Sequence, residues 1–156
     1  MKKHLVLIFF VLGCTRTCVN SREEMTKEQV LEEYLKIAFN MEKQDQKSLL
    51  LEYTTGKLKH AIAQANEASF RDAYLTKRYQ LKKFSVVGTE EMTPNDGTVS
   101  YLLEYLELAE GKTTFKDAAE ISTENKALFK KENARWYIEE ISEAKTLFNL
   151  PDTRVP

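Results

Sequence analysis

Alternating apolar residues and turn signals between Tyr79 and Ile141 constrain the fold of this chain more than any other stretch. The segment Thr93-Pro-Asn-Asp-Gly97 carries the strongest turn signal, because Asp and Gly accept positive φ at little cost. A second turn is indicated at Glu132-Asn133-Ala134, and the residues after it are aromatic and β-branched and include the single tryptophan, Trp136. The stretch therefore predicts a four-stranded antiparallel sheet whose last hairpin spans Ala127 to Ile141.

Helical signals fill the chain before Tyr79. Thr26-Lys-Glu-Gln29 has the form of a capping box, and apolar residues follow it at helical spacing, which predicts a helix over 27–41. We expect shorter helices from Asp45 to an end at Gly56, over 57–66, and over 69–77. The apolar face of a sheet needs a cover, and these helices are the largest elements available. The predicted fold class is α+β, with N-terminal helices packed on the sheet.

The segment 99–108 is apolar on both faces of the expected strand. Tyr101 and Leu103 alternate on one face, whereas Leu102, Leu106 and Leu108 occupy the other. Three explanations are open. A β-bulge near 103–105 turns the later leucines inward, the C-terminal residues 147–150 cover them, or the sheet face contacts a second copy of the chain or another protein partner.

Composition and charge limit the classes of partner. The 156 residues suffice for one domain with a real core, and 42% are hydrophobic. Lys and Arg together number 23 against 24 for Asp and Glu, so the net charge is −1. A near-neutral chain has no electrostatic attraction to a phosphate backbone, and we therefore expect no nucleic-acid partner.

The N-terminus has the pattern of a secretory signal. A basic start is followed by an apolar run over 5–12, which is too short to cross a bilayer as a helix. The run ends in Val11-Leu12-Gly13-Cys14, which resembles a bacterial lipobox. That resemblance implies cleavage before Cys14 and its acylation, with palmitate among the attached chains. A disulfide between Cys14 and Cys18, or an ordinary cleavage site, is the alternative.

These signals divide the chain into four parts. We expect a signal peptide over 1–13, a lipidated tether over 14–24, one α+β domain over 25–145 and a C-terminal tail over 146–156. The expected location is the bacterial cell envelope, with the membrane as a partner through the lipid anchor. Because Thr15 rather than Asp follows Cys14, the resemblance to enterobacterial lipoproteins implies the outer membrane if the source is Gram-negative.

The order of elements, helices first and an antiparallel meander after them, resembles the nuclear-transport-factor-like superfamily of cystatin-like α+β cones. The resemblance covers about Thr26 to Ile141 and includes the closing Ala134-Arg-Trp-Tyr-Ile138 pattern. The chain is similar in particular to small bacterial lipoproteins with this fold. The resemblance implies a curved sheet whose concave face is filled by the helices. Families with this fold include isomerases, dehydratases, small-ligand binders and non-catalytic partner modules, so the fold does not decide the activity.

Residues with catalytic chemistry are few. After the signal segment the only histidine is His60, which lies beside lysines rather than on an apolar stripe, and a typical zinc site needs more ligands. The acidic pairs Glu90-Glu91 and Glu139-Glu140 are adjacent, so their side chains point apart. We therefore expect no metal, no cofactor and no catalytic set.

A pocket inside the cone would be lined from the first helix and the sheet. The candidate lining residues are aromatic or apolar: Tyr34, Phe39, Tyr101, Leu103 and Trp136. The alternative is that these side chains only fill the core, with Trp136 packed as a buried anchor against the first helix near Tyr34 or Leu35. The function expected from the sequence is a lipid-anchored, non-catalytic envelope module that binds a protein partner or a small apolar ligand. The alternative function is an isomerase- or dehydratase-like enzyme that uses the cone cavity.

Overall fold

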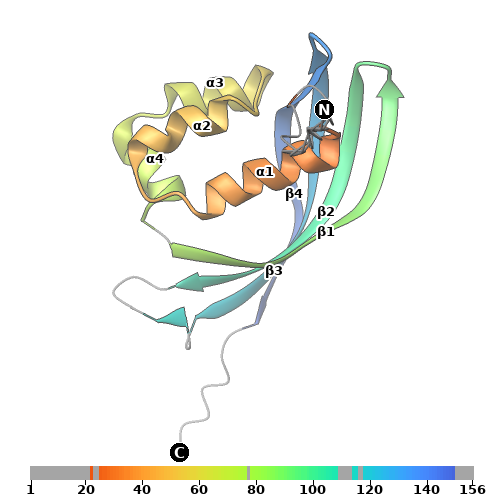
Figure 1. Cartoon of the computed structure of the whole chain (residues 1–156). Helices are drawn as coiled ribbons and strands as arrows, with labels where there is room; N and C mark the ends of the chain where they lie inside the picture. Colours follow the sequence, from red (N-terminus) through yellow and green to blue (C-terminus); the bar gives the residue numbers. More distant parts are fainter. Residues whose placement is uncertain (1–21, 23–24, 77, 109–113, 116–117, 150–156) are drawn as a thin grey trace, which may run out of the picture.

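The computed structural model describes residue 22 and residues 25–76, 78–108, 114–115 and 118–149 (Figure 1). The expected signal peptide, Cys14, Cys18 and Leu150 lie outside the described residues. Among the described residues, no helix is long and apolar enough to cross a membrane.

Helices come first in the chain, as expected. They are α1 (Lys27–Phe39), the 3₁₀ turn η2 (Gln44–Gln46), α2 (Lys47–Leu51), α3 (Gly56–Gln64) and α4 (Glu67–Tyr74). The predicted capping box begins α1, because the Thr26 hydroxyl accepts from the Gln29 amide and the Gln29 side chain accepts from the Thr26 amide.

Two helix boundaries differ from the prediction. Gly56 has the expected positive φ of 49° but begins α3 instead of ending α2. A Cβ at Gly56 would also lie 2.9 Å from the Glu139 side chain. The cap of α4 is Asn66, whose side chain accepts from the Ser69 amide at 2.9 Å, so Ser69 is not the cap.

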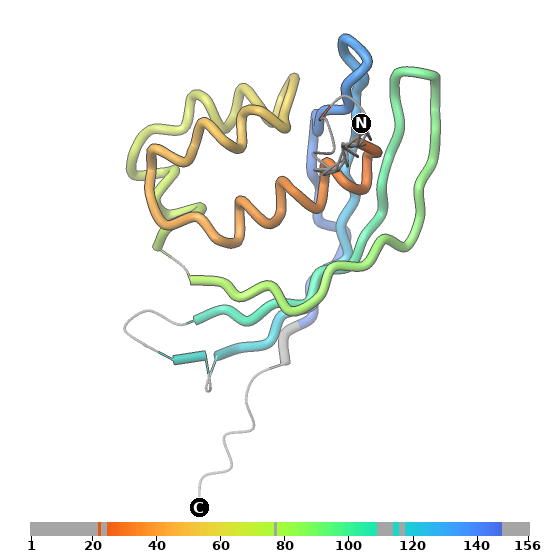
Figure 2. Tube along the Cα trace, in the orientation of Figure 1, coloured from red at the N-terminus to blue at the C-terminus, as the bar shows by residue number. Residues whose placement is uncertain are grey.

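The four predicted strands are present: β1 (Arg78–Thr93), β2 (Asp96–Leu108), β3 (Ala119–Glu132) and β4 (Arg135–Asn149). They form one sheet in the order β1-β2-β3-β4, and each neighbouring pair is antiparallel. The sheet curves, and the helices lie on its concave side (Figures 1 and 2). The predicted α+β class is confirmed. Residues 146–149, which we placed in a tail, belong to β4.

Bulges occur in the outer strands and not in the centre. The register of β1 shifts in three places, between Leu81 and Lys83, between Val86 and Gly88, and between Glu91 and Thr93, and β4 shifts opposite 124–125 and opposite 128–129. The β2–β3 pairing is regular along its whole length, so the bulge near 103–105, one of the three open explanations, does not occur. Because side chains of a regular strand alternate, Leu102 and Leu106 stay on the convex face, where both are half-buried. Extra residues bend and twist a strand, which accounts for the curvature of the sheet.

The core lies between α1 and the concave face. One stripe of α1 is buried, and the inward side chains of the three later strands meet it: Val30, Leu31, Tyr34, Leu35, Val99, Tyr101, Ala127, Phe129 and Ile138. Ile138 is fully buried, whereas Trp136 is only half-buried, so the buried anchor of β4 is Ile138. The bulge in β4 also brings Ile141 inward opposite Ala127, although simple alternation places it on the outer face.

Residues 53–55 cross the outer edge of β4. The Thr55 amide donates to the Ile138 carbonyl at 2.9 Å, and the Ile138 amide donates to the Tyr53 carbonyl at 2.9 Å. Thr54 is fully buried there and forms a parallel bridge with Ile138. This crossing holds α2 and α3 against the sheet.

The β3–β4 turn contains an unfavourable backbone conformation that a substitution can relieve. Asn133 and Ala134 have φ values of 49° and 65°, a conformation that Asn tolerates and Ala does not. We expect Ala134→Gly to raise the free energy of unfolding by about 0.5–1 kcal/mol, as measured by urea denaturation. The control is Ala68→Gly, an exposed site inside α4, which should lower it by about 1 kcal/mol. A destabilised Ala134→Gly protein would contradict the turn geometry.

Candidate functional site

An inner pocket of about 180 Å³ lies where the last turn of α1 and the end of α4 face the concave side of the sheet. Its lining combines aromatic, small and polar side chains: Ala38, Phe39, Ala73, Tyr74, Tyr79, Leu103, Tyr105, Thr123, Asn125 and Glu143. Because α1 ends at Phe39, the sheet has no helical cover from α1 beyond that point. The pocket is therefore the open end of the cone.

Two polar residues of β3 form part of the sheet wall. The inward positions of β3 are 121, 123, 125, 127 and 129, and all are buried. Thr123 and Asn125 are the polar members of this row, 3% and 7% exposed, and the Asn125 amide donates to the Thr123 hydroxyl at 2.7 Å. Buried polar groups cost stability unless they are paired, and this pair faces a pocket rather than solid core.

Three aromatic rings from three elements form the other wall. Phe39 of α1, Tyr79 of β1 and Tyr105 of β2 lie edge to face, with ring centroids 5.4–5.9 Å apart. This separation is typical of favourable aromatic pairs. The cluster is half-buried, so its rings also form the rim of the pocket.

Tyrosine hydroxyls continue from the rim into the core. The Tyr34 and Tyr74 hydroxyl oxygens lie 3.4 Å apart. Burial is the main cause that raises the pKa of Tyr34 and of Tyr101 well above 10, and Tyr74 adds to the effect on Tyr34. Burial also raises the pKa of Tyr105 to about 12, with smaller contributions from Tyr79 and nearby carboxylates. The phenols of Tyr34, Tyr101 and Tyr105 are therefore neutral hydrogen-bonding groups at physiological pH.

Glu143 is the one carboxylate among the described residues of the inner pocket. It lies on β4 directly opposite Asn125, and therefore on the same face of the sheet. Its side chain is exposed and accepts a hydrogen bond from the Thr146 hydroxyl.

An outer pocket of about 450 Å³ adjoins the inner one and shares Phe39, Tyr74 and Tyr79 with it. Its further lining includes Glu42 and Arg78, so the outer pocket carries both signs of charge. The Arg78 guanidinium lies 5.8 Å from the Phe115 ring centroid.

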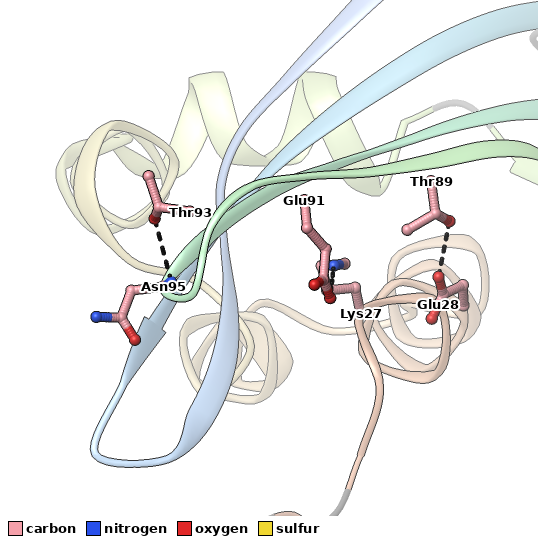
Figure 3. Close-up of polar contacts among 6 residues, drawn as sticks. All are labelled: Lys27, Glu28, Thr89, Glu91, Thr93 and Asn95. Carbon is pink, nitrogen blue, oxygen red and sulfur yellow. Dashed lines mark hydrogen bonds and ion pairs between the residues drawn. The ribbon is translucent and has the colours of Figure 1, made fainter.

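At the opposite end of α1, polar contacts join the helix to β1 (Figure 3), beside a pocket of about 360 Å³. Lys27 is only 4% exposed, and its ammonium lies 3.2 Å from the Glu91 carboxylate and 4.7 Å from the Trp136 ring centroid. Gly97 makes room for it, because a Cβ there would lie 2.9 Å from the Lys27 ammonium. The Thr89 hydroxyl donates to Glu28 at 2.7 Å, a bond that helps to lower the pKa of Glu28 although burial acts against it.

The residues considered for catalysis lie apart from one another among the described residues. His60 is exposed on α3 and lines neither the inner nor the outer pocket. Within the described ranges no three His, Cys, Asp or Glu side chains come close enough to hold a metal ion. Asp72 is exposed on α4, and Glu104 pairs with Lys83 on the convex face at 3.5 Å.

The five candidate lining residues lie in three different places. Phe39 and Leu103 line the inner pocket. Tyr34 and Tyr101 are buried behind it, where Tyr34 reaches Tyr74 and the Tyr101 ring packs 5.8 Å from that of Phe84. Trp136 lies at the far end of α1, beside Lys27, rather than near Tyr34 or Leu35.

Sequence reasoning missed the polar wall of the pocket. The sequence does contain a signal, because polar residues disturb the apolar alternation of the segment 119–126. The strand is continuous from Ala119 to Glu132, and the pattern is poor because Thr123 and Asn125 occupy inward positions. Polar residues in the inward register of a central strand were therefore the marker of the site.

Solved structures share this fold. No family model matches the chain, and no curated protein matches it. The chain is similar to the intermembrane-space region of the chloroplast protein ARC6, with 18% identity and a TM-score of 0.55 over 74% of this chain and 92% of that one. More distant likenesses are VirB8 of Agrobacterium tumefaciens (11% identity, TM-score 0.47, 82% of this chain and 97% of that one) and an Ntf2-like protein involved in plasmid conjugation (12%, 0.47, 81% and 49%). The likeness to ARC6 shows a shared fold and nothing about activity.

The raised tyrosine pKa values predict a two-phase alkaline titration of the folded protein. The neutral phenols of Tyr34, Tyr101 and Tyr105 are favoured in the folded state, so their contribution to stability is complete below about pH 10. It is lost as the pH rises through their folded-state pKa values, which is about 12 for Tyr105. We expect near-ultraviolet absorbance to show a late phase that the unfolded protein lacks, and Tyr105→Phe should reduce it. Coincident titration of all seven tyrosines near pH 10 would contradict the burial.

Proposed function

We propose that this protein is a lipid-anchored, non-catalytic module of the cell envelope that binds a small, largely apolar ligand in the inner pocket. The observation that carries the proposal is the buried Asn125–Thr123 pair in the wall of an aromatic-lined pocket. Ligand sites are mostly apolar and contain a few fixed polar groups that orient the ligand, which is the composition of this pocket.

The polar pair is costly if its only role is structural. Apolar side chains of similar shape at 123 and 125 would fill the concave face without desolvating an amide, and such exchanges are often neutral or stabilising. A ligand that uses the amide accounts for its presence. The inner face of β3 is otherwise apolar, with Ile121, Ala127 and Phe129.

The alternative, an isomerase- or dehydratase-like enzyme, would have to use Glu143 as its base. Glu143 is exposed, and the described lining of the inner pocket contains no histidine beside it. A general base works best with a pKa close to the operating pH, usually through burial. The lining therefore favours the binding module.

The membrane anchor rests on the lipobox-like Val11-Leu12-Gly13-Cys14, which lies outside the described residues. The first described residue, Arg22, donates to the Glu52 carbonyl, and its guanidinium lies 4.0 Å from the Tyr53 ring centroid. The segment 15–21 can span at most about 25 Å. An anchor at Cys14 would thus hold the domain close to the bilayer surface.

Substitution of the two cysteines tests the anchor. Cys14→Ser should remove the acyl chains, because acylation needs the thiol, and should move the protein from the membrane to the soluble fraction. Cys18→Ser is the matched control, and it should keep both the lipid mass and the membrane location. Intact-mass spectrometry and fractionation measure both properties. A Cys14→Ser protein with unchanged mass increment and location would refute the anchor.

Phenol, a small apolar ring with one hydroxyl, tests the pocket. We expect it to bind the full-length chain with a dissociation constant on the order of 1 mM. Shifted amide resonances in two-dimensional NMR spectra should cluster on β2, β3 and the end of α1. The double variant Thr123→Val/Asn125→Leu should lose phenol binding, while its free energy of unfolding stays within about 1 kcal/mol of the parent or rises.

A plug at the pocket rim provides the steric control. Ala73 is exposed on α4 and lines the inner pocket, whereas Ala68 is exposed on the same helix and does not. Ala73→Trp should block phenol binding, and Ala68→Trp should leave it intact. Equal phenol binding by both variants, or no phenol binding by the parent chain, would remove the support for a binding pocket.

A further inference from the structure

The charge and the ring faces of the inner pocket have a consequence for the kind of ligand it accepts. We propose that the pocket selects a small organic ammonium ion, with the aromatic cluster of Phe39, Tyr79 and Tyr105 and the Glu143 carboxylate as its recognition groups. This inference rests on the proposed function, that the inner pocket binds a ligand, and it specifies the chemical class of that ligand.

The first support is the sign of the charges. Among the described residues that line the inner pocket there is one carboxylate and no Lys, Arg or His. Asn125 uses one N–H of its amide to donate to Thr123, and its amide oxygen, an acceptor, can face a ligand together with the second N–H. The pocket therefore presents negative charge, an acceptor oxygen and π faces, all of which attract a cation.

The second support is the arrangement of the rings. Phe39, Tyr79 and Tyr105 come from α1, β1 and β2, and each ring lies 5.4–5.9 Å from the other two. The rings contact one another edge to face, so a cation cannot lie among them, but all three line the inner pocket and a cation there can contact the ring faces that border it. The rings are half-buried at the rim, so a cation entering there is partly desolvated and the attraction is stronger than at an exposed site.

The third support is the electrostatic environment of Tyr105. Burial is the largest cause of its raised pKa, and Glu107 and Glu143 raise the pKa further because they disfavour a phenolate beside them. The same carboxylates that disfavour an anion at this place favour a cation. The outer pocket contains Arg78 as well as Glu42, so its lining carries one charge of each sign. The preference for a cation is therefore expected of the inner pocket.

The volume limits the size of the ligand. About 180 Å³ is below the usual range for sites of drug-sized molecules, which begins near roughly 300 Å³. A trimethylammonium head group with a short chain is compact and apolar on its surface yet carries a full charge. The methyl groups of such a ligand match the apolar lining of the pocket, and its positive charge matches the Glu143 carboxylate.

The experiment compares choline with 3,3-dimethyl-1-butanol, which has the same shape with a neutral carbon in place of nitrogen. Both are titrated into the full-length chain by calorimetry. We expect choline to bind at least about tenfold more tightly than its neutral analogue. Amide resonances of β2, β3 and β4 that line the inner pocket should shift with choline.

Variants of the chain separate the two recognition elements. Glu143→Gln should weaken choline binding about fivefold without changing the binding of the neutral analogue. Glu140→Gln, on the same strand but paired with Lys57, is the matched control and should have no effect. Tyr105→Leu should weaken choline binding about tenfold, and Tyr105→Phe, which keeps the ring, should stay within about twofold of the parent.

The outcomes distinguish this inference from the proposed function. Equal binding of choline and its neutral analogue would overturn the selection of a cation and leave the pocket as a site for small apolar ligands. Phenol binding without any choline binding would also overturn the inference alone. If none of the three compounds binds the inner pocket, both the inference and the proposed binding function fall.

Discussion

The packing of α1 into the concave face of the sheet is the contact on which the other features depend. Val30 and Leu31 of α1 are fully buried there, and burial of each such side chain contributes roughly 1.5–3 kcal/mol. The sheet can surround the helix because bulges in β1 and β4 bend its outer strands. A flat sheet would contact α1 along one line and leave no enclosed space at the end of the helix.

The two ends of α1 have different chemistry. At the N-terminal end a buried lysine is held by Glu91 and Trp136, and a separate pocket of about 360 Å³ lies beside them. At the C-terminal end the helix stops at Phe39 while the sheet continues, and the inner pocket occupies the remaining space. The polar pair on β3 lies at the open end, where a ligand can compensate for its desolvation.

Local signals predicted the elements well, because caps and turns depend on neighbouring residues. The capping box at Thr26 was identified in this way. The turn expected in 93–97 is also present, but it lies at Pro94-Asn95, and Asp96 and Gly97 begin β2 without positive φ. The site was predicted in part: Phe39 and Leu103 were named, whereas Asn125 was not. The inward position of Asn125 depends on the register of β3 against its neighbouring strands. The residues of β4 that face inward beyond Ile138 depend on register shifts in that strand, which have no local sequence signal.

The bulges and the crossing at residues 53–55 also bear on contacts between copies of the chain. The sheet is open, so β1 and β4 each have an outer edge with backbone groups that another strand could pair with. Three register shifts distort β1, and residues 53–55 already hydrogen-bond to the outer edge of β4 at Ile138. Both edges are thereby poor templates for strand addition. The same distortions that shape the pocket would therefore suppress edge-to-edge aggregation.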